Sequence, residues 1–344
     1  MNVITLKPPY LIFLGDVTEL TYAKTGAGLA QWRPDACAGQ LSLVKPGLAL
    51  GLPDMNVEQA IAANVGSLII GTATVGGVIP ESWLDTLIEA AEAGLDIVSG
   101  AHGRLQDNPR LAAAAQKSGA RLVDVRVPPA GLPVASGKKR SGKRLLTVGT
   151  DCAVGKKYTA LALHAALKNA GMDADFRASG QTGIMISGQG IPMDSVVSDF
   201  LSGAAELLSP DNSPEHWDII EGQGAIIHPA YGAVSVGLLM GSQPDAFVVC
   251  HEAGRTHIAG WPEIPLVKIA EIILRTVAVG RLTNPAIRCV GVSVNTSALA
   301  PDTRATYLQN LERQLGLPCV DPLIEGVDDI IECLVNDSIP EPVE

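Results

Sequence analysis

The chain has 344 residues, of which 47% are hydrophobic and 18% charged, and its formal net charge is −11. This composition is typical of a well-buried globular protein with room for two domains, and it excludes a disordered chain. The negative charge argues against broad binding to nucleic acids or to anionic membranes, because both require basic surfaces.

The cysteines and the apolar runs indicate the compartment. No apolar run reaches the roughly 18 residues that span a bilayer, and the amino terminus lacks the basic-then-apolar layout of an export signal. We therefore expect a cytoplasmic protein with reduced thiols and no membrane attachment. The six cysteines are scattered without a C-x-x-C pair, at Cys37, Cys152, Cys250, Cys289, Cys319 and Cys333.

Short apolar strands alternate with helices through the first part of the chain, which predicts a parallel sheet covered on both faces. A polar, glycine-bearing loop is expected after the first strand, at residues 24–34. His102 and Arg104 follow the third strand, and they either contribute to a ligand site or stabilise their loop. The predicted strands are 10–14, 67–70, 95–98 and 121–125, and the predicted helices are 56–64, 80–93 and 109–117.

Residues 127–143 are rich in proline, glycine and serine. This composition predicts a linker at 129–143 between a domain at 1–128 and a domain at 144–344. A basic cluster within and just after it is interpreted as solvated side chains of the linker. The cluster consists of Lys138, Lys139, Arg140, Lys143 and Arg144.

The second domain repeats the α/β pattern on a larger scale. Its apolar segment at residues 234–240 suits a subunit interface as well as a core, and a homo-oligomer is expected. The predicted strands are 145–148, 174–178, 217–220, 246–250 and 289–294, and the predicted helices are 159–170, 193–208, 266–279 and 301–315.

A glycine-bounded loop between the first strand and helix of this domain reads G-T-D-C-A-V-G-K from Gly149 to Lys156. Backbone N–H groups and the positive end of a helix dipole converge on an anion in such a loop, and Lys156 adds a charge. Lys157 stands where an ATP-binding loop has the hydroxyl that holds Mg²⁺. The predicted phosphate-binding residues are Gly149, Thr150, Asp151, Cys152, Ala153, Val154, Gly155, Lys156, Lys157 and Tyr158.

Polar residues follow the later strands, whose carboxyl ends share one edge of a parallel sheet. Glu221 stands where a P-loop protein often places a second acidic residue. Arg177 and Arg255 are each candidates to bind a carboxylate through two N–H groups, or are ordinary salt-bridge partners. His228 suits a general base near neutral pH.

Two further chemistries have candidate residues at these positions. The histidines at 228, 251 and 257 match no zinc spacing, so no metal site is predicted. Cys152 lies at a helix amino terminus, which predicts a lowered pKa and permits a nucleophilic role. Phosphate binding already explains the lysine-lined loop, and it is the preferred interpretation.

Several blocks of the sequence occur together in one known family. In this combination the chain resembles the P-loop family that includes the D-glutamate N-acetyltransferase DgcN. The resemblance implies a Rossmann-like amino-terminal domain and a P-loop NTPase-like carboxy-terminal domain with three α/β/α layers. The blocks are Trp32-Arg33-Pro34, residues 95–102 and 149–156, Ser179-Gly180-Gln181-Thr182-Gly183, Glu221-Gly222-Gln223-Gly224 with His228-Pro229, and residues 241–246.

The resemblance also implies a reaction, the transfer of an acetyl group from acetyl-CoA to the α-amine of D-glutamate. The product, N-acetyl-D-glutamate, would pass to a partner dehydrogenase. On this hypothesis the P-loop holds the phosphates of CoA, and His228 or Glu221 acts as the base. The expected substrate-binding residues are Arg177, Gln181, Thr182, Gln223 and Arg255.

Two alternatives remain open from the sequence. An ATP-dependent ligase or kinase that resembles dethiobiotin synthetase would use ATP and Mg²⁺ in the same loop, but Lys157 replaces the magnesium hydroxyl. A non-catalytic nucleotide-binding protein needs fewer polar strand-end residues than this chain has. The missing hydroxyl favours a loop that holds the phosphates of a carrier.

Overall fold

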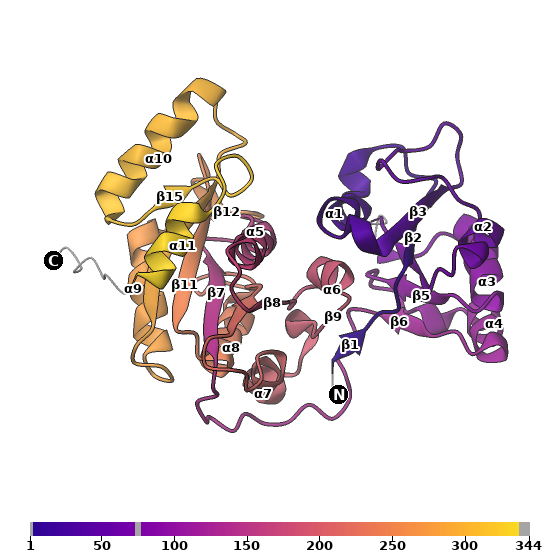
Figure 1. Cartoon of the computed structure of the whole chain (residues 1–344), viewed down its shortest axis with the longest axis horizontal. Coiled ribbons are helices and arrows are strands. Elements are labelled where there is room, and N and C mark those ends of the chain that lie inside the picture. Colours follow the sequence, from indigo (N-terminus) through magenta and orange to yellow (C-terminus); the bar gives the residue numbers. More distant parts are fainter. Residues whose placement is uncertain (1–2, 73–76, 337–344) are drawn as a thin grey trace. The chain divides into compact units, whose positions relative to one another are not determined.

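The computed structural model describes residues 3–72 and 77–336. They form two compact units; in Figure 1 the first runs from indigo to purple and also includes the rose-coloured α6 (Gln181–Ser187) and β9 (Gln189–Gly190). The first unit contains Val3–Pro129 and also Gln181–Ser195, and the second contains Ala130–Gly180 and the chain from Val196 onward. Among the described residues, no helix is both long and apolar enough to cross a membrane.

The first unit is built on a five-stranded sheet with strand order β3-β2-β4-β5-β6. Every neighbouring pair in it is parallel, as the alternation of strands and helices predicts. Its strands are β2 (Tyr10–Gly15), β3 (Cys37–Ser42), β4 (Ser67–Ile70), β5 (Asp96–Ser99) and β6 (Leu122–Asp124).

Alternate residues of β2 face different layers because side chains along a strand point to opposite faces. Leu11 and Phe13 enter one core with Trp83, and the rings of Phe13 and Trp83 meet edge to face at 5.3 Å. Ile12 faces α1 (Lys24–Trp32) on the other side. The helices of the first core are α2 (Val57–Ala62), α3 (Glu81–Glu92) and α4 (Pro109–Ser118).

The prediction of a loop at residues 24–34 is therefore wrong. Most of this segment forms α1, and its glycines allow close packing: a Cβ on Gly26 would lie 3.0 Å from Ile12 Cγ2 and 3.2 Å from the carbonyl oxygen of Gly71. Glycine disfavours a helix by about 1 kcal/mol, and here tertiary packing overrides that preference.

Residues 181–195 leave the second half of the chain and join the first unit. They form α6 (Gln181–Ser187), β9 (Gln189–Gly190) and the short turn η5 (Met193–Ser195). Strand β9 pairs antiparallel with β1 (Ile4–Thr5). Arg33 Nη1 donates to the carbonyl oxygens of Ile186 (3.2 Å) and Ser187 (3.1 Å) at the end of α6. The sequence places this segment in the second domain, whereas the structure places it in the first unit.

The second unit contains a six-stranded parallel sheet in the order β15-β14-β11-β7-β10-β8. The chain starts at the central β7, fills one side with β8 and β10, and then fills the other side. Ligands bind at such a switch point, beyond the carboxyl ends of the strands. The strands are β7 (Lys143–Gly149), β8 (Ala174–Arg177), β10 (Trp217–Ile220), β11 (Ala246–Glu252), β14 (Arg288–Asn295) and β15 (Cys319–Val320).

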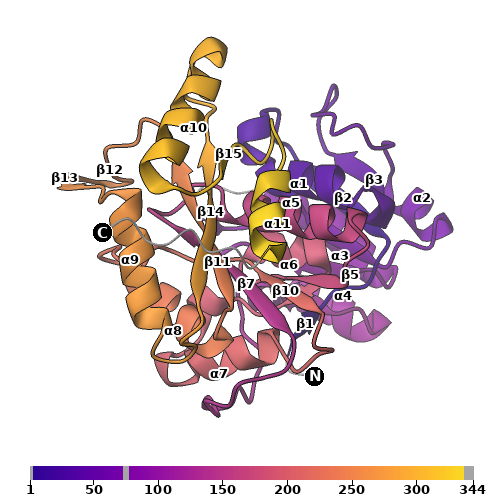
Figure 2. The same ribbon diagram turned by 60° about the vertical axis from the view of Figure 1, so that its left-hand side comes forward.

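Helices cover both faces of this sheet, which makes three layers (Figure 2). One face carries α5 (Lys156–Asn169) and α11 (Asp328–Val335). The other carries α8 (Gly232–Ser242) and α9 (Ile269–Gly280), with α7 (Ser198–Leu208) packed on α8. Beside β15 lies α10 (Pro301–Leu315), and a hairpin of β12 (His257–Ile258) and β13 (Trp261–Pro265) follows β11. The two-domain α/β architecture predicted from the sequence is confirmed.

The predicted linker is fastened to the second unit. Arg144 has no exposed surface, and its guanidinium donates to carbonyl oxygens on both sides, including those of Arg140 (3.1 Å) and Pro210 (3.1 Å). Glu206 of α7 accepts the backbone N–H groups of residues 136 and 137. The interpretation of Arg140 and Arg144 as solvated side chains is wrong, because backbone carbonyl groups that the sequence pattern does not reveal surround them.

Candidate active site

The loop between β7 and α5 requires its glycines. A Cβ on Gly149 would lie 2.7 Å from the carbonyl oxygen of Asp151 and 2.9 Å from Lys156 Nζ. Gly155 has φ of +104°, which side chains rarely adopt, and Ala153 has φ of +56°. These left-handed residues turn the chain sharply from the strand into the helix.

The same loop presents hydrogen-bond donors without protein acceptors. Within the described part of the chain, the backbone N–H groups of Ala153, Val154 and Gly155 have no protein acceptor, and α5 begins directly after them with the positive end of its dipole. Lys156 is buried, which lowers its pKa, and its Nζ donates to the carbonyl oxygen of Asp151 at 2.8 Å. An anion is the ligand that such an arrangement stabilises.

Two predicted phosphate-binding side chains instead hold the loop in place. The backbone N–H of Thr150 donates to Cys250 O at 3.0 Å, and its hydroxyl lies 3.1 Å from Nδ1 of His251. Asp151 is fully buried and accepts from Cys152 N (2.6 Å), Arg255 Nη1 (2.8 Å) and Ala259 N (2.8 Å). These bonds tie the loop to β11 and to the segment that follows it.

Lys157 and Tyr158 continue the loop into the helix. Lys157 Nζ lies 4.3 Å from the centre of the Tyr158 ring, so the two side chains form a cation–π contact. The position that holds a magnesium hydroxyl in an ATP-binding loop is therefore occupied by a cation packed on an aromatic ring.

Both arginines expected to bind substrate carboxylates already have acidic partners. Arg177 Nε donates to Asp218 at 2.6 Å, and its Nη2 lies 3.0 Å from Asp175. Arg255 is paired with Asp151 at 2.8 Å and with Glu252. Their charges are neutralised within the second unit, so this geometry gives the carboxylate-binding hypothesis no support.

Glu221 lies at the carboxyl end of β10, next to the strand that carries the loop. One carboxylate oxygen accepts the backbone N–H groups of Ser179 (3.0 Å) and Gly180 (2.9 Å). Burial raises the pKa of Glu221 to about 7, although these bonds and the charges of Lys157 and Lys156 lower it. The side chain is therefore able to exchange a proton near neutral pH.

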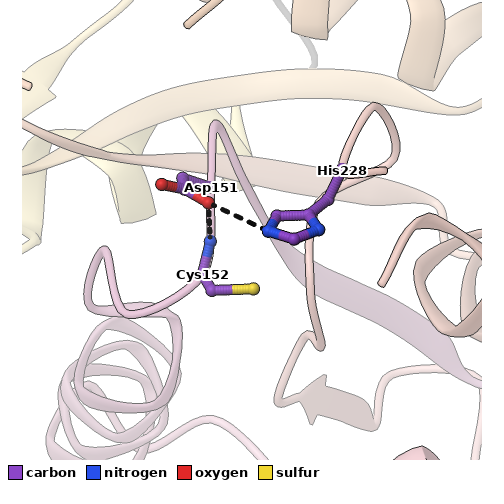
Figure 3. Close-up of side chains that lie close together, drawn as sticks. All are labelled: Asp151, Cys152 and His228. Carbon is purple, nitrogen blue, oxygen red and sulfur yellow. Dashed lines mark hydrogen bonds and ion pairs between the residues drawn. The ribbon is translucent and has the colours of Figure 1, made fainter. Parts of the chain in front are cut away.

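His228 is fixed in one tautomer by the backbone. Its Nδ1 accepts the N–H groups of Ala230 (3.1 Å) and Tyr231 (3.2 Å), so the neutral ring carries its hydrogen on Nε2. Nε2 lies 3.7 Å from Asp151 Oδ1, and a dashed line joins the two side chains in Figure 3; the ring packs against Tyr231 (4.7 Å) and Trp261 (4.8 Å). In this state Nε2 is a donor, which makes His228 a weaker candidate for the base than Glu221.

Asp151, Cys152 and His228 bring three metal-ligand atoms within 4.8 Å of one another (Figure 3). A ligating histidine normally donates its other ring N–H to an acceptor, whereas Nδ1 of His228 accepts two N–H groups. This donor set does not fit a metal ion. Burial also raises the pKa of Cys152, so the predicted lowering of that pKa is wrong.

The predicted glutamines and threonine lie in different units. Gln223 Nε2 donates to the hydroxyl of Ser179 at 2.9 Å in the second unit. Gln181 and Thr182 begin α6 in the first unit, where the Thr182 hydroxyl lies 3.3 Å from that of Thr25. Ser179, whose backbone N–H donates to Glu221, was not among the predicted site residues; its only signal in the sequence is the Ser-Gly pair after a predicted strand.

The chain matches both parts of one family. Residues 36–128 match the Rossmann-like domain of unknown function DUF1611_N, and residues 133–331 match the P-loop domain of unknown function DUF1611_C. A crystal structure of a DUF1611 family protein from Anabaena variabilis ATCC 29413 is 33% identical with a TM-score of 0.81. The match covers 95% of this chain and 99% of that protein.

Two curated relatives are similar along almost the whole length, and both are named D-glutamate N-acetyltransferase. The one from Tritonibacter scottomollicae is 45% identical over 329 residues, which is 96% of this chain and 99% of the relative. The one from Pseudoalteromonas sp is 46% identical over 326 residues, 95% of this chain and 98% of the relative. By family models, sequence and fold alike, the chain belongs to the DUF1611 family, with a Rossmann-like amino-terminal domain and a P-loop carboxy-terminal domain.

Proposed function

We propose that the chain is an N-acetyltransferase that acts on D-glutamate. The observation that carries this proposal is the 45% and 46% identity to two proteins of that name, over 96% and 95% of the chain. Identity at this level along both domains is consistent with a shared reaction, because the match covers 96% and 95% of the chain.

The acetyl donor that we assign is acetyl-CoA. Its phosphates suit the unpaired N–H groups of Ala153, Val154 and Gly155, the amino terminus of α5 and the charge of Lys156. Lys157 offers nothing to a magnesium ion, which supports a carrier's phosphates over a nucleotide that is cleaved. The pantetheine arm of CoA separates these phosphates from the thioester by many bonds.

In the reaction, Glu221 removes a proton from the ammonium group of D-glutamate. The free amine attacks the carbonyl carbon of the thioester, the tetrahedral intermediate collapses, and the thiolate of CoA leaves and takes up a proton. Glu221 suits the first step because burial brings its pKa to about 7. His228 in the tautomer that its two backbone contacts favour would donate a hydrogen bond and not accept this proton.

One assay tests the proposal against its rivals. The purified chain is mixed with acetyl-CoA and either D- or L-glutamate. The release of free thiol is followed over time, and the product is identified by mass spectrometry. Thiol release with D-glutamate, together with N-acetylglutamate, is the expected result. Phosphate release from ATP without thiol release would show a ligase or kinase instead.

A further inference from the structure

The first unit contains a pocket of about 350 Å³ that the reaction described above does not use. It lies at the carboxyl ends of β5 and β6 and extends to η5. Small-molecule sites have volumes of this order, and parallel sheets bind ligands at this edge. The ionisable side chains that line it are His102, Arg104, Asp124, Arg126 and Asp194.

Two arginines with different surroundings face this pocket. Arg126 is anchored, because its Nε donates to the carbonyl oxygen of Gly100 at 2.8 Å and its Nη1 lies 3.6 Å from Asp194. Within the described residues, no ion pair within 4.0 Å and no hydrogen bond engages the side chain of Arg104, although its charge acts on Asp124 and lowers the pKa of that carboxyl against the effect of burial. One guanidinium is thus fixed in place, and the other is available to a ligand.

Two carboxylates balance these cations. Asp124 accepts the backbone N–H of Leu105 at 3.1 Å, which fixes its orientation. Asp194 comes from the segment that crosses into this unit from the second half of the chain. The pocket therefore combines two guanidinium groups and an imidazole with two acidic groups.

We infer that this pocket binds an acidic amino acid, the class to which the proposed acceptor belongs. The two arginines match the two carboxylates of such a ligand, and an aspartate matches its ammonium group. A phosphate would use the arginines equally well, but Asp124 and Asp194 would repel it. The identity of the ligand in this inference rests on the proposed function. The location of the binding site rests on the pocket.

The pocket also offers what the predicted arginines of the second unit do not, a guanidinium group that is available to a substrate carboxylate. Arg177 and Arg255 are neutralised there by aspartate and glutamate side chains. The P-loop of the second unit suits the phosphates of the donor. His102 and Arg104, which the sequence offered as ligand or loop residues, belong to the acceptor's site.

The test uses the full-length chain and the variant Arg104→Ala. D-glutamate is titrated by calorimetry in the absence and presence of CoA, and the KM of each substrate is measured. Loss of one charge-assisted contact should weaken D-glutamate binding and raise its KM by at least about tenfold, with CoA affinity unchanged. The matched control is Arg110→Ala, an exposed arginine of α4 paired with Asp85, which should bind D-glutamate as the unmodified chain does.

A ligand pair tests the aspartates separately. Glutarate has both carboxylates of glutamate but no amine, so the unmodified chain should prefer glutamate. In Asp194→Asn this preference should shrink by about fivefold or more, because the ammonium group loses an ionic partner.

The outcomes separate this inference from the proposed function. If Arg104→Ala binds D-glutamate with unchanged affinity and KM, the pocket is not the site. Inorganic phosphate that displaces D-glutamate equally well from the pocket would overturn the amino-acid assignment. If the unmodified chain acetylates no D-glutamate, the proposed function is wrong. The inference about the pocket is then supported only if another acidic amino acid binds in a way that depends on Arg104. If none does, this inference is wrong as well.

Discussion

At the scale of single residues, Glu221 combines burial with two backbone hydrogen bonds. Burial raises its pKa to about 7, while the N–H groups of Ser179 and Gly180 favour the charged form. A carboxylate in this state accepts a proton more readily than an exposed glutamate does and is still substantially ionised at neutral pH.

Glu221→Gln should therefore lower kcat by ~10²- to 10⁴-fold, the range for loss of a general base. Glutamine keeps an oxygen that can accept the N–H groups of Ser179 and Gly180, so the loop should keep its shape. In the unmodified enzyme, kcat/KM should rise with pH through about 7, and this limb should vanish in the variant. Turnover within about threefold of the unmodified enzyme would show that another group is the base.

Lys156→Ala should weaken CoA binding by roughly 10- to 100-fold, because a charge-assisted hydrogen bond contributes about 1.5–3 kcal/mol. Calorimetry with CoA measures this loss, and circular dichroism checks that the fold is intact. Lys168→Ala is the control, since Lys168 lies exposed in the last turn of the same helix. Equal losses in both variants would contradict a specific phosphate contact.

At the scale of elements, the sequence predicts those with a regular apolar pattern. The central strands and the helices α3, α4 and α10 were expected within two residues of their observed ends. Elements with glycines were missed or left ambiguous. In α8, Gly237 lies against Leu201, where a Cβ would approach to 1.8 Å, so glycine there serves helix packing. The local conformational preference of the sequence does not predict such contacts, because they depend on a segment that is distant in the chain.

The segment before β7 gives a prediction of its own. Arg144→Ala leaves several buried carbonyl groups without their donor and should lower the free energy of unfolding by about 3 kcal/mol or more. Urea unfolding of both proteins measures the change. Lys143→Ala is the neighbouring control: its exposed pair with Glu215 should be worth less than about 1 kcal/mol. A small effect at Arg144 would mean that water replaces the guanidinium.

At the scale of the whole molecule, Glu221 makes stability depend on pH. Its pKa is 4.5 when unfolded and about 7 when folded, so the folded state binds more protons between these values. Stability from this group is full below pH 4.5 and is lost as pH rises through about 7. The loss is about 3 kcal/mol at most.

Urea unfolding of the unmodified chain and of Glu221→Gln at pH 5 and pH 8 tests this effect. The variant cannot ionise at this position, so its stability relative to the unmodified chain should increase between the two pH values. The contributions of other titrating groups to the pH dependence of stability are the same in both proteins and cancel in the comparison. Parallel pH profiles would show that Glu221 titrates near its unfolded pKa.

The site as a whole was predictable in its position but not in its detail. The order of strands places the P-loop and Glu221 at one edge of a parallel sheet, and both lie there. The pairing of Arg177 with Asp218 and of Arg255 with Asp151 was not predictable, because these two aspartates lie far away in the sequence, in β10 and in the P-loop. The tautomer of His228 depends on two backbone N–H groups in the turn that follows it, which composition does not reveal.

The passage of residues 181–195 into the first unit has a consequence for how this protein can be divided. Separating the units requires three cuts in the chain, at 129/130, 180/181 and 195/196, and not one cut at the linker. A fragment that ends at Pro129 lacks β9, the partner of β1, and lacks the helix that Arg33 holds. During synthesis, the first unit can be completed only after the P-loop and its helix have left the ribosome. The first unit therefore cannot be produced whole as a continuous fragment that ends at the linker.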